Sequence, residues 1–311
     1  MKKHAPKAAL CHARSIVMPW SVIRSDTSPS RHLSQTPPAV FSVCQRESPA
    51  RLFNNEEILH LNTYDFMAYV GKSVINPGGT PGRDKILALV KPQPGTRVLE
   101  IGCGTGHTAC HIARRYRCHV TALDISPAMI DTARQVVQTQ KLQEQVDCRV
   151  GDIAHLPFAD HTFDSVICQA VLMFVDKQAA LQEIRRVLRA HSRFAGLEFS
   201  WRCEPPPRVR DLTYRICGCR TLEFYSAAVW GQHLQQAGFD TVESHEQPFT
   251  MLSPSGFLRD EGVANSLKIF GRIVRRKANL QRMGEIWQHF SRYTEYFSYT
   301  VLAGVTPGHP A

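Results

Sequence analysis

The 311-residue sequence contains no apolar run of about 18 residues, the length that a membrane-spanning helix needs. Internal repeats and a C-x-x-C framework are also missing. The ten cysteines are scattered, and only Cys217 and Cys219 stand close together, as a C-x-C pair. These absences predict no transmembrane segment and no metal site. We expect most of the cysteines to be reduced thiols in a reducing compartment.

Acidic residues are scarce at the start of the chain. Residues 1–53 contain eight lysine or arginine residues but only Asp26 and Glu47, so they carry a net charge of +6. The stretch is rich in Ser, Pro, Arg and His and has no sustained period, which predicts disorder. We interpret it as a disordered leader, either a tail or a targeting segment, because basic, Ser-rich and acid-poor composition is typical of transit peptides. We expect a cytoplasmic protein, or a mitochondrial-matrix protein if the leader is a transit peptide.

The remaining residues, 54–311, carry +4 of the total charge of +10, so nucleic acid is not the expected partner. Strand and helix signals alternate along this part of the chain, which indicates an α/β domain. The predicted strands are 98–101, 118–123, 146–150, 163–168, 194–199, 239–244 and 296–305. The predicted helices are 56–70, 84–90, 108–116, a helix starting at Ser126-Pro127, 177–189 and 227–237, with turns at 76–82 and 189–193.

Two stretches interrupt this alternation and are interpreted as insertions. The first, at about 201–225, contains three consecutive prolines and a predicted helix over 211–225. The second, at about 246–294, contains a long, mostly helical stretch over 253–290 with basic residues midway. Such a basic run is typical of a solvated helix face and less often of a partner or membrane surface. We predict that both insertions form helical lids that exclude water from an active site.

A glycine-rich turn follows the first predicted strand, with the sequence Glu100-Ile-Gly102-Cys-Gly104-Thr-Gly106. A strand, a glycine turn and a helix form the first half of a nucleotide-binding βαβ unit. A dinucleotide loop has the pattern G-x-G-x-x-G, but its third glycine would fall at His107. An acid before the first glycine would repel a pyrophosphate. The pattern therefore favours a ligand that has an ammonium group and no phosphate.

This segment resembles motif I of the class I S-adenosylmethionine (SAM) dependent methyltransferases, and in particular the small-molecule methyltransferase type 11 subgroup. The resemblance covers roughly residues 60–245. It implies a seven-stranded, Rossmann-like, mostly parallel sheet with an antiparallel last strand, helices on both faces, and SAM as cofactor. The chain departs from the family at 189–193, where Pro-Gly-Gly is usual.

Polar residues at the ends of further strands extend the predicted cofactor site. Asp124 ends the second strand, where a carboxylate can accept hydrogen bonds from ribose hydroxyls. Gln169 follows the fourth strand at the edge where open α/β sheets bind ligands. By resemblance, Glu100 would bind the methionine amino group and Asp152 the adenine edge. The predicted cofactor-binding residues are Glu100, Gly102, Cys103, Gly104, Asp124, Ile125, Asp152, Ile153 and Gln169.

The resemblance implies methyl transfer from SAM to a small-molecule or lipophilic acceptor. An acceptor that is a hydroxyl or an acidic carbon would also need a general base. The possible residues are His107, His111, His155 and Glu198, and none of them is assigned to that role. Three alternatives stay open: an RNA methyltransferase, a non-catalytic SAM-binding protein, and a thiol-using arsenic methyltransferase suggested by Cys203, Cys217 and Cys219. The acceptor atom and the oligomeric state are not predicted.

Overall fold

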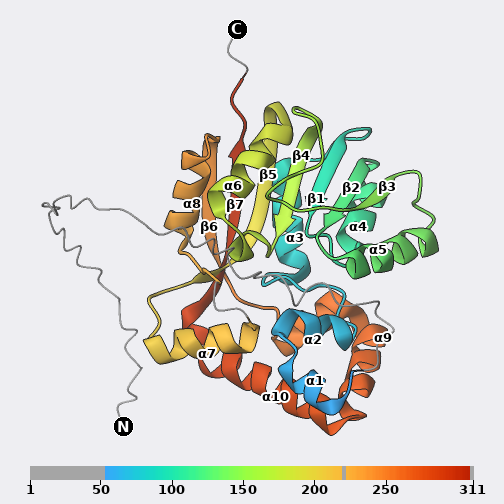
Figure 1. The fold of residues 1–311 in the computed structure, drawn as a ribbon, viewed down its shortest axis with the longest axis vertical. Helices are drawn as coiled ribbons and strands as arrows, with labels where there is room; N and C mark the ends of the chain where they lie inside the picture. Colours follow the sequence, from blue (N-terminus) through green and yellow to red (C-terminus); the bar gives the residue numbers. More distant parts are fainter. Residues whose placement is uncertain (1–52, 219–221, 309–311) are drawn as a thin grey trace, which may run out of the picture. The chain divides into compact units, whose positions relative to one another are not determined.

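The computed structural model describes residues 53–218 and 222–308 (Figure 1). The predicted leader, apart from Phe53, lies outside the described residues, so its assignment stays a prediction. None of the described helices combines the length and the apolarity that are needed to cross a membrane.

Seven strands form one sheet in the order β3-β2-β1-β4-β5-β7-β6. They are β1 (Arg97–Ile101), β2 (His119–Asp124), β3 (Val146–Val150), β4 (Phe163–Gln169), β5 (Leu188–Trp201), β6 (Asp240–Pro248) and β7 (Phe297–Val305). β1 to β5 pair in parallel, whereas β7 is antiparallel to both β5 and β6. The predicted Rossmann-like α/β class is therefore confirmed. The strand order reverses between β1 and β4, which is the point where such sheets bind ligands.

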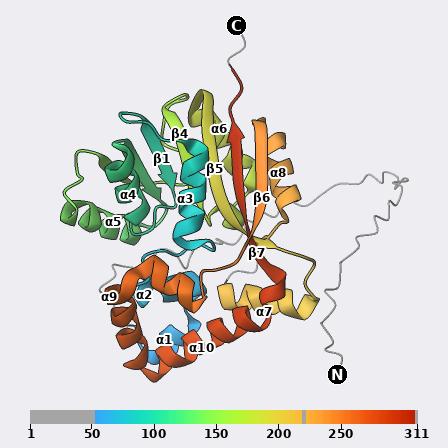
Figure 2. The same cartoon turned by 180° about the vertical axis from the view of Figure 1, so that it is seen from behind.

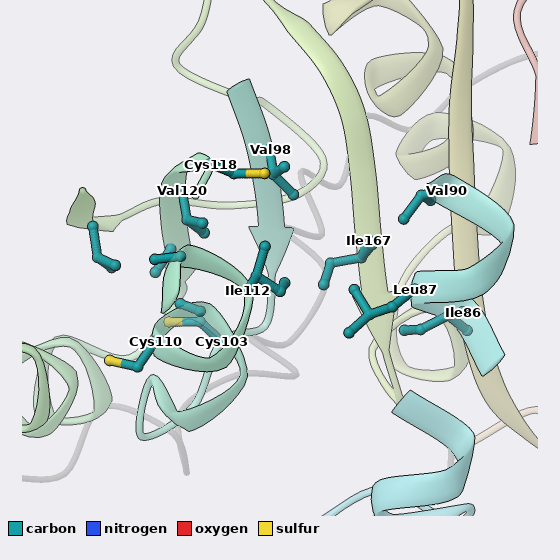
Figure 3. Packing of buried hydrophobic residues seen from close by; sticks show 14 of the residues in the cluster. Ile86, Leu87, Val90, Val98, Cys103, Cys110, Ile112, Cys118, Val120 and Ile167 are labelled. Carbon is teal, nitrogen blue, oxygen red and sulfur yellow. The ribbon is translucent and has the colours of Figure 1, made fainter. Parts of the chain in front are cut away.

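Helices pack on both faces of the sheet. One face contacts α3 (Gly79–Val90), α4 (His107–Tyr116) and α5 (Pro127–Thr139), and the other contacts α6 (Lys177–Val187) and α8 (Ala227–Gln236). Val98 and Leu99 are neighbours in β1 but belong to different cores, because successive strand side chains point to opposite faces. Figure 3 shows Leu87 of α3 pointing toward Ile167 of β4 in the first of these cores.

Five further helices gather beyond the carboxyl ends of the parallel strands, and we call them the helical cap (Figures 1 and 2). They are α1 (Asn55–His60), α2 (Thr63–Tyr69), α7 (Pro207–Cys217), α9 (Pro254–Val274) and α10 (Lys277–Arg292), with the short 3-10 helices η1 (Leu172–Phe174) and η2 (Thr294–Tyr296) nearby. The cap has an aromatic core. Phe199 of β5 stacks on Phe224 with ring centroids 5.3 Å apart, and Phe249 stacks on Phe290 of α10 at 5.2 Å.

The turn predicted at 189–193 lies inside β5, which begins at Leu188 directly after α6 ends at Val187, and the pairing of β5 with β4 shifts register there. The strand makes this irregular bend without a glycine. His191 adopts a left-handed φ of 55°, and the Ser192 N–H donates to Thr306 Oγ1 at 2.9 Å. The side chain of Thr306 therefore stabilises this bend.

Several predicted helix boundaries are also wrong. The helix expected at 211–225 is α7, which starts earlier because Pro207 suits a first turn and ends early because Gly218 adopts φ 74°. The helix expected at 56–70 is divided into α1 and α2, since the Asn62 side chain accepts from the Asp65 N–H and starts a new helix.

The predicted boundaries are also wrong at two other places, both of which contain glycine or proline. The turn expected at 76–82 includes the first turn of α3, which tolerates Pro81 because the first helical N–H groups need no helical partner. The helical stretch expected at 253–290 is divided into α9 and α10. Gly262, with φ 67° and ψ 169°, interrupts α9 itself.

Candidate functional site

The carboxyl ends of four parallel strands meet at one edge of the sheet. Ile101 of β1 pairs with Leu123 of β2 and with Cys168 of β4, and Asp124 pairs with Val150 of β3. The residues that follow these pairs therefore lie beside one another. This register brings together the four polar residues predicted from the sequence, Glu100, Asp124, Asp152 and Gln169.

The glycine turn is held by backbone hydrogen bonds to β2. The N–H groups of Gly102 and Cys103 both donate to the Leu123 carbonyl, at 2.8 and 3.0 Å. Gly102, Gly104 and Gly106 all have positive φ, of 71°, 51° and 78°. A Cβ at Gly102 would lie 2.2 Å from Val171 Cγ2, whereas a Cβ at Gly104 would meet nothing within 4 Å. Gly102 is therefore required for packing, and Gly104 leaves room for a ligand.

Glu100 presents a buried carboxylate to this turn. The residue is 2 % exposed, and burial raises the pKa of its carboxyl group to about 8, with repulsion from Asp124 adding to the effect. Gln169 Nε2 lies 3.4 Å from Oε1, while Oε2 is buried and has no hydrogen-bond partner among the described residues. Such an unsatisfied acceptor costs free energy unless a donor reaches it.

A chain of amides fixes which way Gln169 points. The Gly78 N–H can only donate, and it donates to Asn76 Oδ1 at 3.0 Å. Asn76 Nδ2 must therefore donate to Gln169 Oε1, at 3.1 Å, and this leaves Gln169 Nε2 to face Glu100 and Thr108 Oγ1. The turn at 76–78 thus fixes the Gln169 amide so that its NH2 group, and not its oxygen, faces Glu100.

Asp124 and Asp152 each organise the loop that follows their strand. Asp124 Oδ2 accepts from the Gly104 N–H and Oδ1 from the Ser126 N–H, both at 2.9 Å. Burial raises the pKa of this carboxyl group, and these hydrogen bonds oppose the rise. Asp152 Oδ1 accepts from the Ala154 N–H at 2.9 Å. Each carboxylate oxygen has two lone pairs, so both residues retain acceptor capacity for a ligand.

Two apolar residues follow these acids in the sequence. Ile125 is 40 % exposed although it follows a buried strand, and Ile153 is buried. Cys103 is also buried within the glycine turn, and burial raises the pKa of its thiol above the ordinary range. The thiol is therefore neutral, and this part of the site offers apolar contacts and backbone groups rather than charge.

Among the described residues, no hydrogen bond joins Glu198 to any of the three histidines considered as general bases, His107, His111 and His155. Glu198 is fully buried, and its carboxylate accepts from the N–H groups of Val171, Leu172 and Met173 at 3.0, 2.9 and 3.3 Å. Burial raises its pKa to about 7. Glu198 thus stabilises the turn after β4, including Val171, which packs against Gly102. Burial lowers the pKa of His107 and His111, so both are neutral near pH 7.

Three residues that the sequence pattern did not predict contact Gln169 or the glycine turn: Asn76, Thr108 and Val171. Asn76 lies in an Asn-Pro-Gly-Gly segment that reads as an ordinary turn, and only the fold brings it to β4. Val171 follows Gln169 directly, so its place after a predicted central strand was the one available signal.

These residues fit a ligand that combines an ammonium group with an uncharged nucleoside. The orphaned Oε2 of Glu100 suits an ammonium donor, and the space beside Gly104 admits ligand atoms. Asp124 and Asp152 offer acceptors for hydroxyl and amine groups. The acid at 100 disfavours a phosphate, which agrees with the glycine spacing.

Comparison with known proteins gives the same reading. A family model described as a methyltransferase domain matches residues 99–195. An uncharacterised methyltransferase, YodH, of Bacillus subtilis is 27% identical over 180 residues, which cover 58% of this chain and 75% of the relative. The ubiquinone/menaquinone biosynthesis C-methyltransferase UbiE of Ruegeria is 33% identical over 120 residues, or 38% of this chain and 48% of that protein.

A solved structure supports the fold. The SAM-dependent methyltransferase from Thiobacillus denitrificans, in complex with S-adenosyl-L-homocysteine, superposes with a TM-score of 0.61 at 17% identity. The match covers 79% of this chain and 99% of that chain. The domain match and the methyltransferase relatives support a class I SAM-dependent methyltransferase, and the solved structure shares the Rossmann-like sheet.

Proposed function

We propose that the protein transfers the methyl group of SAM to a small, largely apolar acceptor. The observation that carries this proposal is the buried, unpartnered Glu100 Oε2 beside the open space at Gly104. In this arrangement Glu100 accepts from the ammonium group of the methionine part, and Gln169 orients the carboxylate. The turn residues Gly102, Cys103 and Gly104 supply close backbone contacts.

The nucleoside part is assigned to the ends of β2 and β3. Asp124 accepts from the ribose hydroxyls, since its carboxylate lies at the end of a strand with Oδ2 toward the glycine turn and Oδ1 toward Ser126. Asp152 accepts from the adenine amine, and Ile125 and Ile153 offer apolar surface to the ring. SAM, when bound, supplies a methyl group that is already activated by its sulfonium.

The acceptor class is inferred from the helical cap. Phe174, Phe199 and Phe224 belong to the aromatic core that begins after β4 and at the end of β5. Aromatic side chains bind apolar molecules by burial and by ring stacking. The chain's part in the reaction is to align the acceptor and exclude water, and orientation alone can lower a barrier by roughly 7–11 kcal/mol. The UbiE relative, named for quinone biosynthesis, agrees with a lipophilic acceptor.

The direct test is calorimetric titration of the full chain with SAM and then with NAD. We expect SAM to bind and NAD not to bind. An acceptor screen with methyl-labelled SAM should then find label transfer to apolar small molecules, with S-adenosylhomocysteine as the second product. The Glu100→Gln variant serves as the control that lacks the proposed ammonium partner. Tighter binding of NAD than of SAM would contradict the proposal, and so would label transfer to RNA alone.

A further inference from the structure

The second half of α9 exposes a continuous apolar stripe. Val263, Leu267, Phe270 and Val274 follow one another at intervals of three or four residues, so they lie on one side of the helix. Their exposed fractions are 64 %, 66 %, 63 % and 45 %. The opposite side is already occupied, because Ile269 and Ile273 are buried in the core of the cap. The stripe therefore contributes nothing to the packing of the described chain.

The same region has charge of one sign only. No Asp or Glu occurs between Glu261 and Glu285, while six cationic residues do. Lys268, Arg272, Arg275 and Lys277 are exposed, Arg276 is half-buried and Arg282 is buried. The Glu261 side chain at one end is fully buried. Along α9 and the start of α10, the surface thus combines exposed apolar side chains with exposed cations, whereas Arg282 is buried and pairs with Glu285 at 3.3 Å.

We propose that the outer face of α9, with the start of α10, docks on the surface of an anionic lipid membrane. A helix that has large apolar residues on one side and Lys or Arg beside them binds at the headgroup boundary, where both features are used at once. Leu280 of α10 is 48 % exposed and extends the apolar surface. Figures 1 and 2 show α9 at the outer edge of the cap, where a flat surface can reach it.

Three other partners fit this face less well than an anionic membrane does: a second copy of the chain, the leader and RNA. A second copy in a two-fold interface would bring Lys268 and Arg275 of both copies together. The leader, residues 1–53, carries a net charge of +6 and would be repelled. RNA would satisfy the cations but would leave the apolar stripe in water. Docking of this face is independent of the proposed methyl acceptor, because the stripe residues take no part in the cofactor site.

The experiment is flotation of the full chain with two kinds of vesicle, phosphatidylcholine alone and equal parts of phosphatidylcholine and phosphatidylserine. We expect binding to the second kind, weakening as salt is raised. The double variant Leu267→Gln with Phe270→Gln should lose at least about tenfold in affinity, and so should Lys268→Glu with Arg275→Glu. The matched control is Arg114→Glu with Arg185→Glu, two exposed cations on α4 and α6, which should retain binding.

Circular dichroism and SAM titration should be unchanged in all of these variants, which separates docking from folding and from the cofactor site. Binding that survives both α9 variants would show that the leader drives it and would overturn the proposal. The proposal also fails if neither vesicle binds. A change of oligomeric state in the Leu267→Gln, Phe270→Gln variant without vesicle binding, or salt-dependent retention of RNA in its place, would overturn it as well.

Discussion

At the residue scale, Glu100 links cofactor binding to pH. With a pKa of about 8, its carboxyl group is mostly protonated at neutral pH in the free chain. An ammonium donor favours the ionised form, so SAM affinity should rise close to tenfold per pH unit from about pH 6 to about pH 7.5. Titration calorimetry across this range measures the slope. Because the pKa of Glu100 is raised from 4.5 to about 8 on folding, the free energy of unfolding should fall as pH rises from about 4.5 to about 8.

The Glu100→Gln variant provides the control for this prediction. It keeps an acceptor oxygen but does not ionise, so the pH slope should disappear and SAM affinity near pH 7.5 should fall by about tenfold, the usual loss for a charge-assisted hydrogen bond. The free energy of unfolding should decline less between about pH 5 and about pH 8 than in the parent chain, and the decline that remains comes from other buried carboxyl groups such as Glu198. An unchanged slope in this variant would show that another group titrates.

Asp124 gives a second residue-scale prediction. Replacement by Ala removes the acceptor of the Gly104 and Ser126 N–H groups and the proposed ribose partner, so Asp124→Ala should weaken SAM binding at least several fold. Isothermal titration measures the loss, and thermal melting separates it from unfolding. Asp131→Ala, an exposed acid on α5 paired with Arg134, should leave the affinity unchanged. Equal affinity of Asp124→Ala and the parent chain would exclude the ribose role.

At the element scale, two glycines of the same turn have different roles. Gly102 is required for packing, and Gly104 leaves space for a ligand. Gly102→Ala should cost several kcal/mol of unfolding free energy, because its Cβ would overlap Val171 and its φ is positive. Gly104→Ala should cost only about 1 kcal/mol, for φ alone, yet lose SAM binding, because its Cβ would occupy the ligand space. Denaturant unfolding and calorimetry on both variants check this.

A second substitution, combined with each glycine variant, tests the same assignment of space. Val171→Ala should restore part of the stability lost in Gly102→Ala, since it removes the overlapping methyl group, but should not restore SAM binding to Gly104→Ala. The opposite pattern, with Gly104→Ala unfolding and Gly102→Ala remaining stable, would mean that the assignment of space to the two glycines is wrong.

A helix or strand could be predicted from the sequence where a local residue pattern was enough to specify it. The strand 146–150 matches β3, and α5 starts as expected, because Ser126 caps it and Pro127 fits its first turn. The signals failed where a distant residue completes the element. The bend at 189–193 depends on Thr306, and no local pattern could show that a threonine from the end of the chain stabilises it.

At the scale of the whole molecule, the site draws on segments far apart in the sequence. The acids at strand ends were predictable, because parallel strands end at a common edge. The Asn76–Gln169 pair was not, since its members are 93 positions apart and only the placement of α3 against the sheet joins them. The predicted lid role of the insertions remains a proposal, now resting on their position in the helical cap.

The attachment of α9 to the rest of the chain gives the last prediction. Lys72 and Glu261 form an ion pair at 3.2 Å in which both side chains are fully buried. Burial by itself raises the pKa of Glu261, but the Lys72 ammonium and the hydrogen bonds from Ser73 outweigh it and hold the pKa below its ordinary value. The pair therefore contributes stability above about pH 4.5 that is lost as pH falls through the lowered pKa.

The two partners should not be equivalent when removed. Glu261 also accepts from the Ser73 N–H and hydroxyl and from Asn265 Nδ2, so Lys72→Met leaves it with partners. Glu261→Gln keeps an acceptor oxygen but removes the negative charge, so the buried ammonium of Lys72 loses its counter-charge and retains only the Phe257 ring, 4.9 Å away, as a further electrostatic partner. We expect Glu261→Gln to destabilise by about 3–5 kcal/mol, the usual loss for a broken buried pair, and Lys72→Met by clearly less. Urea unfolding of both variants and of the double variant measures these losses of unfolding free energy. A larger loss in Lys72→Met than in Glu261→Gln would show that the ammonium, rather than the hydrogen-bond donors around Glu261, holds α9 in place.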